Sequence, residues 1–195
     1  MNLATAQIYA ASLKDWLAPH CDRIEIAGSV RRERPNCNDL DLVVIPKLIE
    51  EKDMLGTVVN SRNLAWEAVT DLVKSGKAEF LAGGNVPGKF VNVRLKKTGV
   101  QLDVFFAEPV NFASRFLCRT GSKKHNIWLA QRALDHGGKW EPYIGVSLPA
   151  RVAQSEAALI PAANEIDIYI ALGLQFIEPR DREQTWIRKN LENGL

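Results

Sequence analysis

The segment GSVRRERPNCNDLDLVV, residues 28–44, carries the information that decides the fold of this chain. It opens with a Gly-Ser pair and arginines, and it ends with Asp39 and Asp41 on either side of one leucine, followed by an apolar run. Gly28 lets backbone amides come close to a phosphate, Ser29 adds a hydroxyl, and cationic donors are supplied by Arg31, Arg32 and Arg34. The segment therefore places a loop suited to binding phosphate just before two carboxylates at the start of a buried strand.

The two aspartates are expected to point the same way. The run LVVI, closed by Pro46, predicts a strand over residues 39–45, and residues two apart in a strand share a face. Side-by-side carboxylates repel one another, and a pair of Mg²⁺ ions, which prefer oxygen ligands, would stabilise them. Asp103, in the apolar run VQLDVFF, is the best third ligand. The alternative is that all three aspartates are solvated strand positions.

The hydrophobic pattern predicts an α+β protein. Strands are expected at residues 24–26, 39–45, 78–81, 90–95 and 100–106, and helices at 3–18, 61–74, 111–119, 123–136, from 164 and after 179. Strands dominate up to Pro109 and helices follow it. This change predicts two domains, residues 1–109 and 110–195.

Composition leaves the partner open. The chain has 195 residues, is 46% hydrophobic and carries a formal net charge of +2, which is too small to indicate nucleic-acid binding by itself. Its three cysteines have no CxxC spacing, which favours reduced thiols in a cytosolic setting. No signal peptide or apolar span is evident, so a cytoplasmic protein without a membrane partner is expected.

Three motifs in order resemble those of one enzyme family. The Gly-Ser-x-Arg-Arg and Asp-x-Asp of residues 28–41, RTGSKKHN at 119–126 and NEIDIYIALGLQFIEPRDRE at 164–183 together resemble the nucleotidyltransferase superfamily, and more narrowly the family X DNA polymerases related to DNA polymerase β. The resemblance covers residues from about 20 to 185. It implies a nucleotidyltransferase palm, built on a mixed β-sheet with flanking helices, and a small, mainly helical thumb.

The resemblance also implies a role for each motif position. Asp39, Asp41 and Asp103 would hold two Mg²⁺ ions, for which Mn²⁺ could substitute, and Asp103 would help to activate the primer 3′-hydroxyl. The triphosphate would be held by Gly28, Ser29 and Arg32. The nucleotide would lie near Gly121 and Ser122, and Asn126 would touch its base or sugar.

The implied reaction is nucleotidyl transfer from a nucleoside triphosphate to primed or gapped DNA, as in short gap-filling or repair synthesis. We expect a monomer, which a helper protein could recruit to DNA. Basic residues between the last palm strands and the first thumb helices are candidates to bind the DNA backbone: Lys89, Arg94, Lys96, Lys97, Arg115, Arg119, Lys123, Lys124 and Arg132.

Several positions depart from the family pattern. Cys118 and Arg119 stand where an aromatic pair commonly precedes Thr-Gly-Ser, Gln101 replaces an arginine, and Ala130 stands where an arginine often reaches the template. Sugar selectivity and template dependence are therefore left open. The alternatives are transfer to RNA or a small molecule, template-independent addition, and a non-catalytic nucleic-acid-binding module.

Overall fold

The computed structural model describes residues 1–149 and 158–183 of the chain. The residues form two compact units, Met1–Ile26 with Pro35–Ala107, and Ala27–Arg34 with Glu108–Leu195. The segment expected to bind phosphate thus belongs to the second unit, although the aspartates that follow it belong to the first. The domain boundary placed at residue 109 by the sequence stays a prediction.

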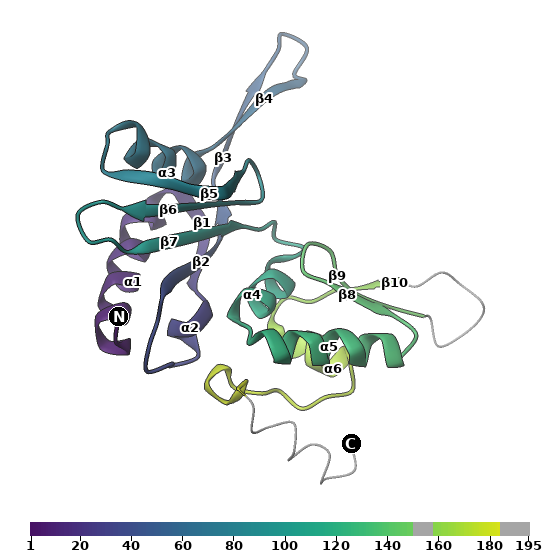
Figure 1. The fold of residues 1–195 in the computed structure, drawn as a ribbon. Coiled ribbons are helices and arrows are strands. Elements are labelled where there is room, and N and C mark those ends of the chain that lie inside the picture. Colours follow the sequence, from purple (N-terminus) through teal and green to yellow (C-terminus); the bar gives the residue numbers. More distant parts are fainter. Residues whose placement is uncertain (150–157, 184–195) are drawn as a thin grey trace. The chain divides into compact units, whose positions relative to one another are not determined.

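The first unit is built on a five-stranded mixed sheet (Figure 1). Its order is β1 (Cys21–Ile26), β2 (Asp39–Pro46), β7 (Gln101–Phe106), β6 (Phe90–Leu95) and β5 (Ala78–Val86). Strands β2 and β7 are parallel, whereas the other neighbours are antiparallel. The predicted α+β class with a mixed sheet is confirmed.

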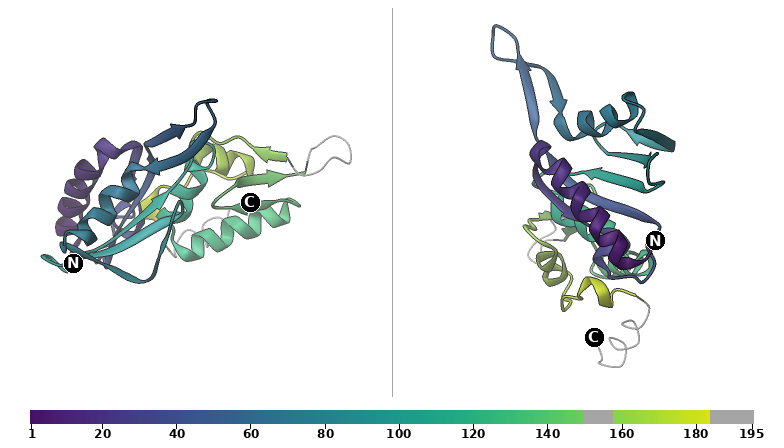
Figure 2. Two further views of the ribbon diagram at one scale, coloured as in Figure 1. Left: turned by 90° about the horizontal axis from the view of Figure 1, so that it is seen from above. Right: turned by 90° about the vertical axis from the view of Figure 1, so that its left-hand side faces the viewer.

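Two helices cover one face of this sheet. They are α1 (Leu3–Leu17), which continues into the short η1 (Ala18–His20), and α3 (Leu64–Lys74). Both lie on the same side of the strands in the left view of Figure 2. Successive side chains along β2, β6 and β7 point to opposite faces of the sheet. One face consists of fully buried aliphatic residues: Leu40, Leu42, Val91, Val93, Leu102 and Val104. The polar residues between them remain on the less buried face.

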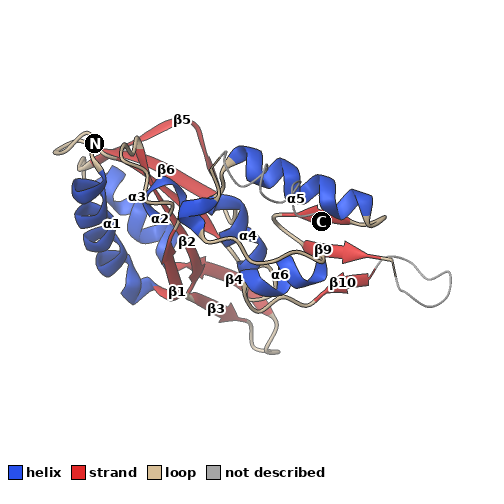
Figure 3. Ribbon diagram, turned by 90° about the horizontal axis from the view of Figure 1, so that it is seen from below, coloured by secondary structure: helices blue, strands red, loops and turns tan. Residues whose placement is uncertain are grey.

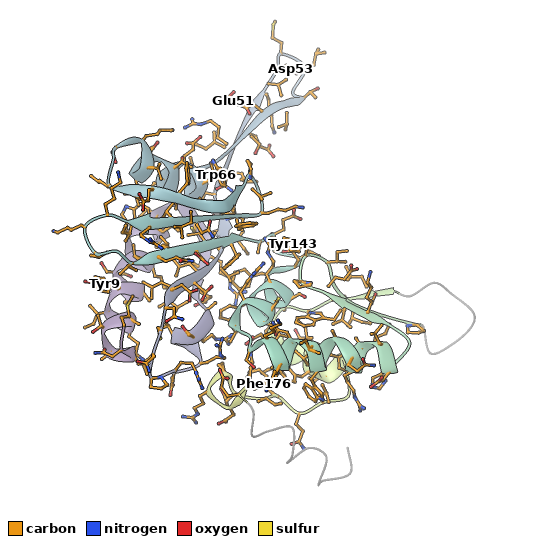
Figure 4. All side chains as sticks on the ribbon, in the orientation of Figure 1. Tyr9, Glu51, Asp53, Trp66, Tyr143 and Phe176 are labelled. Atoms are coloured by element: carbon orange, nitrogen blue, oxygen red, sulfur yellow. The ribbon has the colours of Figure 1, made fainter. Side chains whose placement is uncertain are left out.

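A hairpin that the sequence analysis did not predict lies between β2 and α3. It consists of β3 (Leu48–Lys52) and β4 (Val58–Asn63), and nearly all of its residues are exposed. The Asp53 carboxylate, labelled in Figure 4, accepts hydrogen bonds from the backbone amides of Leu55 and Thr57 and so fixes the turn. The helix expected from residue 61 begins at Leu64 because the Asn63 side chain accepts the Trp66 amide as its N-cap.

The second unit combines helices with a small sheet (Figure 3). The helices are α2 (Gly28–Arg31), α4 (Phe112–Thr120), α5 (Lys123–Asp135), α6 (Glu165–Ala171) and the short η2 (Pro179–Asp181). Strands β8 (Lys139–Glu141), β9 (Gly145–Leu148) and β10 (Ala158–Ile160) form a sheet of order β10-β9-β8. These strands have three or four residues, too few for a periodic pattern, and were not predicted. A helix was expected after Pro179; the described residues there form the 3-10 turn Pro179–Asp181, and residues 184–195 lie outside the described part of the chain.

The helices of the second unit close over their own core, which consists of Ala113, Leu117, Leu129, Ala133, Trp140, Val146, Ile168, Tyr169 and Leu172. Within the described residues, none of the helices in either unit has the length and apolar character to cross a membrane.

Candidate functional site

The first unit brings the three predicted aspartates together on one face of β2 and β7. Asp41 is the register partner of Asp103, and Asp39 is the partner of Gln101. All three carboxylates are half-buried, whereas the leucines and valine between them are fully buried on the opposite face. Parallel pairing places partner residues about 4.8 Å apart between strands, so Asp41 and Asp103 are neighbours.

Strand β6, on the other side of β7, adds one residue to each of these two register pairs. Asn92 is the partner of Asp103, and Arg94 is the partner of Gln101. The Gln101 Nε2 atom donates a hydrogen bond of 3.1 Å to Oδ1 of Asp103. A neutral amide thus orients this carboxylate, at a position where the family that the motifs resemble commonly has an arginine.

The donor chemistry of this face fits a hard cation. Three carboxylates and one side-chain amide oxygen lie on adjacent strands, and oxygen atoms are the ligands that Mg²⁺ prefers. In the described parts of the chain, no three side chains of histidine, cysteine, aspartate or glutamate are gathered into a ready-made metal cluster. The metal-binding triad therefore stays a prediction, supported by the register.

The second unit holds the predicted phosphate-binding loop at α2. Gly28 has a φ of 61°, a conformation that favours glycine, and is buried. The Ser29 hydroxyl oxygen is also buried, and it has no hydrogen-bond partner among the described residues. A buried hydroxyl of this kind can bind an incoming anion without first breaking a protein hydrogen bond.

Arg31 belongs to a buried ion-pair network. Its Nη1 and Nη2 atoms donate to the two carboxylate oxygens of Glu165 at 2.9 and 2.5 Å, and Nη1 also donates to Thr120 Oγ1 at 2.6 Å. Arg182, which is fully buried, donates to Glu165 at 2.9 Å. Burial alone would raise the pKa of the Glu165 carboxyl, but the two arginines outweigh it and hold the pKa below its ordinary value. The network fixes α2 to α4, α6 and the segment after α6.

Arg32 also pairs within the second unit. Its Nε atom lies 2.8 Å from Glu183 Oε1, and Nη1 donates to the Thr120 carbonyl oxygen. Gly121 follows with a φ of 73°, and a Cβ atom there would lie 3.1 Å from Arg32 Nη1. The structure thus explains glycine at position 121, while triphosphate binding by Arg32 stays a prediction.

The other predicted nucleotide-binding residues organise the start of α5. Ser122 is its N-cap, and the Ser122 hydroxyl donates to the Arg182 carbonyl oxygen at 2.7 Å. Asn126 Nδ2 donates to the Cys118 carbonyl oxygen at 2.8 Å. The Asn126 Oδ1 atom is buried and has no partner among the described residues, so an acceptor is available for a ligand. Both residues keep their predicted roles as untested expectations.

Arg115, one of the predicted DNA-binding residues, is buried rather than exposed to solvent. Arg115 is 1% exposed, and its guanidinium lies 3.6 Å from the ring centroid of Tyr143, a residue labelled in Figure 4. Burial lowers the pKa of Arg115 to about 10. The expectation that Arg115 contributes to a solvent-accessible DNA-binding surface was wrong because sequence alone did not show that this helix position faces the core. Among the others, Lys89, Arg94, Lys96, Lys97, Lys123 and Lys124 are exposed.

Comparison with known proteins separates the fold from the activity. Residues 115–183 match the family model described as DNA polymerase beta thumb. Two solved structures of Leishmania infantum polymerase beta, a ternary gap complex and a ternary P/T complex, match with TM-scores of 0.70 and 0.68 and identities of 18% and 20%. Each match covers 94% of this chain, and 71% and 77% of the respective Leishmania chains. No curated protein matches the sequence.

The chain has a polymerase β-like fold. The resemblance seen in the three motifs is confirmed at this level, and the match to the thumb begins within α4 and includes α5 and α6.

Two residues of this polymerase β-like chain were missed by the sequence analysis. Asn92 lies beside Asp103. The strands predicted at residues 90–95 and 100–106, paired as an antiparallel hairpin about a turn at residues 96–99, place these two residues opposite each other. Glu165 was visible only as part of the thumb motif, because pairing with Arg31, 134 positions earlier, leaves no local signal.

His125 makes the stability of the second unit depend on pH. Its ring is fully buried, Nε2 lies 2.7 Å from the Tyr169 hydroxyl, and burial lowers its pKa from 6.5 to about 3. Below pH 6.5 the His125 ring therefore binds a proton in the unfolded chain but stays neutral in the folded chain. The free energy of unfolding is expected to fall by about 1–2 kcal/mol between pH 6.5 and pH 5. Urea unfolding across this range measures the slope, and the variant His125→Gln should flatten it; an equal slope in both proteins would contradict the assignment.

Gly121→Ala is expected to destabilise the polymerase β-like fold. The backbone at Gly121, with φ 73° and ψ −155°, lies in a region that essentially only glycine adopts, and the added methyl would press on Arg32. A loss of about 1–3 kcal/mol is expected in equilibrium unfolding. Gly76→Ala, at a positive φ with nothing within 4 Å of the added Cβ, is the control for a positive φ without a steric contact. The account of Gly121 fails if Gly121→Ala is no more harmful than this control.

Proposed function

We propose that the protein is a DNA-directed nucleotidyltransferase that adds nucleotides from a nucleoside triphosphate to a primer 3′-hydroxyl. The observation that carries the proposal is the row of Asp41 and Asp103 across parallel strands, with Asp39 two residues away on the same face, in a polymerase β-like fold. Primed or gapped DNA is the proposed acceptor, because the solved polymerase beta structures are gap and P/T complexes.

The residues divide the work of the proposed reaction. Asp39, Asp41 and Asp103 would hold two Mg²⁺ ions, which when bound would stabilise negative charge on the reacting phosphate. Gly28 and Ser29 would contact the triphosphate through the backbone and the buried hydroxyl. Asp103, held by Gln101, would accept the proton of the 3′-hydroxyl, so that the oxygen attacks the α-phosphorus as the bond to pyrophosphate breaks.

The neutral contact from Gln101 bears on the same step. An arginine beside Asp103 would lower the basicity of this carboxylate, whereas an amide orients it without adding a positive charge.

A panel of acceptors tests the proposal. The purified protein is incubated with Mg²⁺, deoxynucleotides or ribonucleotides, and a labelled primer that is gapped, paired with a longer template, or single-stranded. Template-directed growth on the paired primers is expected. Growth only on the single strand would move the function to template-independent addition, and no growth on any primer would reject DNA as the acceptor.

A further inference from the structure

Asn92 occupies a position that is costly for an asparagine. It stands between the fully buried Val91 and Val93 in β6, where asparagine is a poor strand former. Its Oδ1 atom is buried and has no hydrogen-bond partner among the residues the structure describes. An unpaired buried acceptor destabilises a fold, so neither strand formation nor local hydrogen bonding accounts for this side chain.

The register places Asn92 next to the proposed cation-binding face. Asp41 of β2, Asp103 of β7 and Asn92 of β6 form one row across three adjacent strands. Their side chains share the face opposite the buried valines and leucines. The row therefore ends in Asn92 Oδ1, a neutral hydrogen-bond acceptor that is buried from solvent.

We propose that Asn92 Oδ1 supplies an additional oxygen to the cation held beside Asp103. This inference rests on the proposed function and deepens it by adding a neutral ligand to the three carboxylates. Hard cations accept amide oxygens as well as carboxylates, and a cation would satisfy the acceptor that the protein leaves unpaired. A neutral oxygen also adds a ligand without adding to the repulsion between the aspartates.

Mn²⁺ binding without DNA or nucleotide tests the inference. The electron paramagnetic resonance signal of free Mn²⁺ is followed during titration of the full chain. Asn92→Leu, which has a similar shape but no oxygen, is expected to weaken binding by about tenfold, whereas Asn92→Asp should bind at least as tightly as the wild type. Asn60→Leu, on the exposed hairpin, is the matched control and should leave binding unchanged.

Thermal unfolding without metal separates this role from a structural one. Asn92→Leu removes an unpaired buried oxygen, so its midpoint should equal or exceed that of the wild type. A lower midpoint with unchanged Mn²⁺ affinity would show a structural role and overturn the proposal, as would a wild type that binds no Mn²⁺. If the wild type binds Mn²⁺ in the expected order of variants but extends no primer, the proposed function fails while the ligand assignment stands.

Discussion

Primer extension is expected to fall by about 10²–10⁴-fold when Asp103 is replaced with asparagine. Asparagine keeps the shape of the side chain but can neither accept the proton of the 3′-hydroxyl nor carry the charge that a cation needs. Asp103 also has Asp41 as its partner on β2, so the substitution removes one of two adjacent carboxylates. Single-turnover extension of a labelled primer measures the loss directly.

The fold should survive this change. Removing one of several neighbouring negative charges relieves repulsion, so the thermal midpoint of Asp103→Asn should equal or exceed that of the wild type. Asp22→Asn, on the exposed side of β1, is the matched control and should extend primers normally. Extension by Asp103→Asn at the wild-type rate would show that this carboxylate takes no part in the reaction.

Glu165→Ala is expected to cost about 3–5 kcal/mol of unfolding free energy. The substitution removes the carboxylate that pairs with Arg31 and with Arg182, and it leaves the fully buried Arg182 charge without its counter-ion. Guanidinium unfolding followed by circular dichroism measures the loss. Glu183→Ala, which breaks the more exposed pair with Arg32, should cost no more than about 1 kcal/mol.

The same carboxylate predicts an acid limit on stability. Because the folded-state pKa of Glu165 lies below its ordinary value of 4.5, its contribution is fully present above pH 4.5 and is lost as the pH falls through the lowered value. Glu165→Gln should remove this part of the pH dependence. Equal costs for Glu165→Ala and Glu183→Ala, or an unchanged acid slope in Glu165→Gln, would contradict the role given to the network.

The strongly periodic parts of the fold could be predicted from the sequence. The apolar run after Asp39 indicated β2, the turn at residues 96–99 separated two strands, and a helix was correctly expected over residues 123–136, where α5 lies. The apolar residues of α5 do not all face the core, however, because Ile127 and Leu134 are exposed while Leu129 and Ala133 are buried. Periodicity located the helix, and packing of the second unit selected the buried side.

The candidate site was only partly predictable for the same reason. Asp39, Asp41 and Asp103 stand in apolar strands, where a carboxylate is conspicuous. The parallel register that makes Asp41 and Asp103 neighbours depends on the order of strands in the sheet, which no local pattern encodes. The pairing of Arg31 with Glu165 is likewise a long-range contact, so the sequence indicated only a cationic donor for phosphate at Arg31.

Nucleotide transfer to a 3′-hydroxyl releases one pyrophosphate for each nucleotide added, so the two products are counted in the same reaction. The wild-type protein is supplied with Mg²⁺, one complementary deoxynucleotide and a primer facing a one-nucleotide gap. The expected result is primer growth by one nucleotide with an equal amount of pyrophosphate released. Release of pyrophosphate without primer growth, or neither product at any protein concentration, would contradict it.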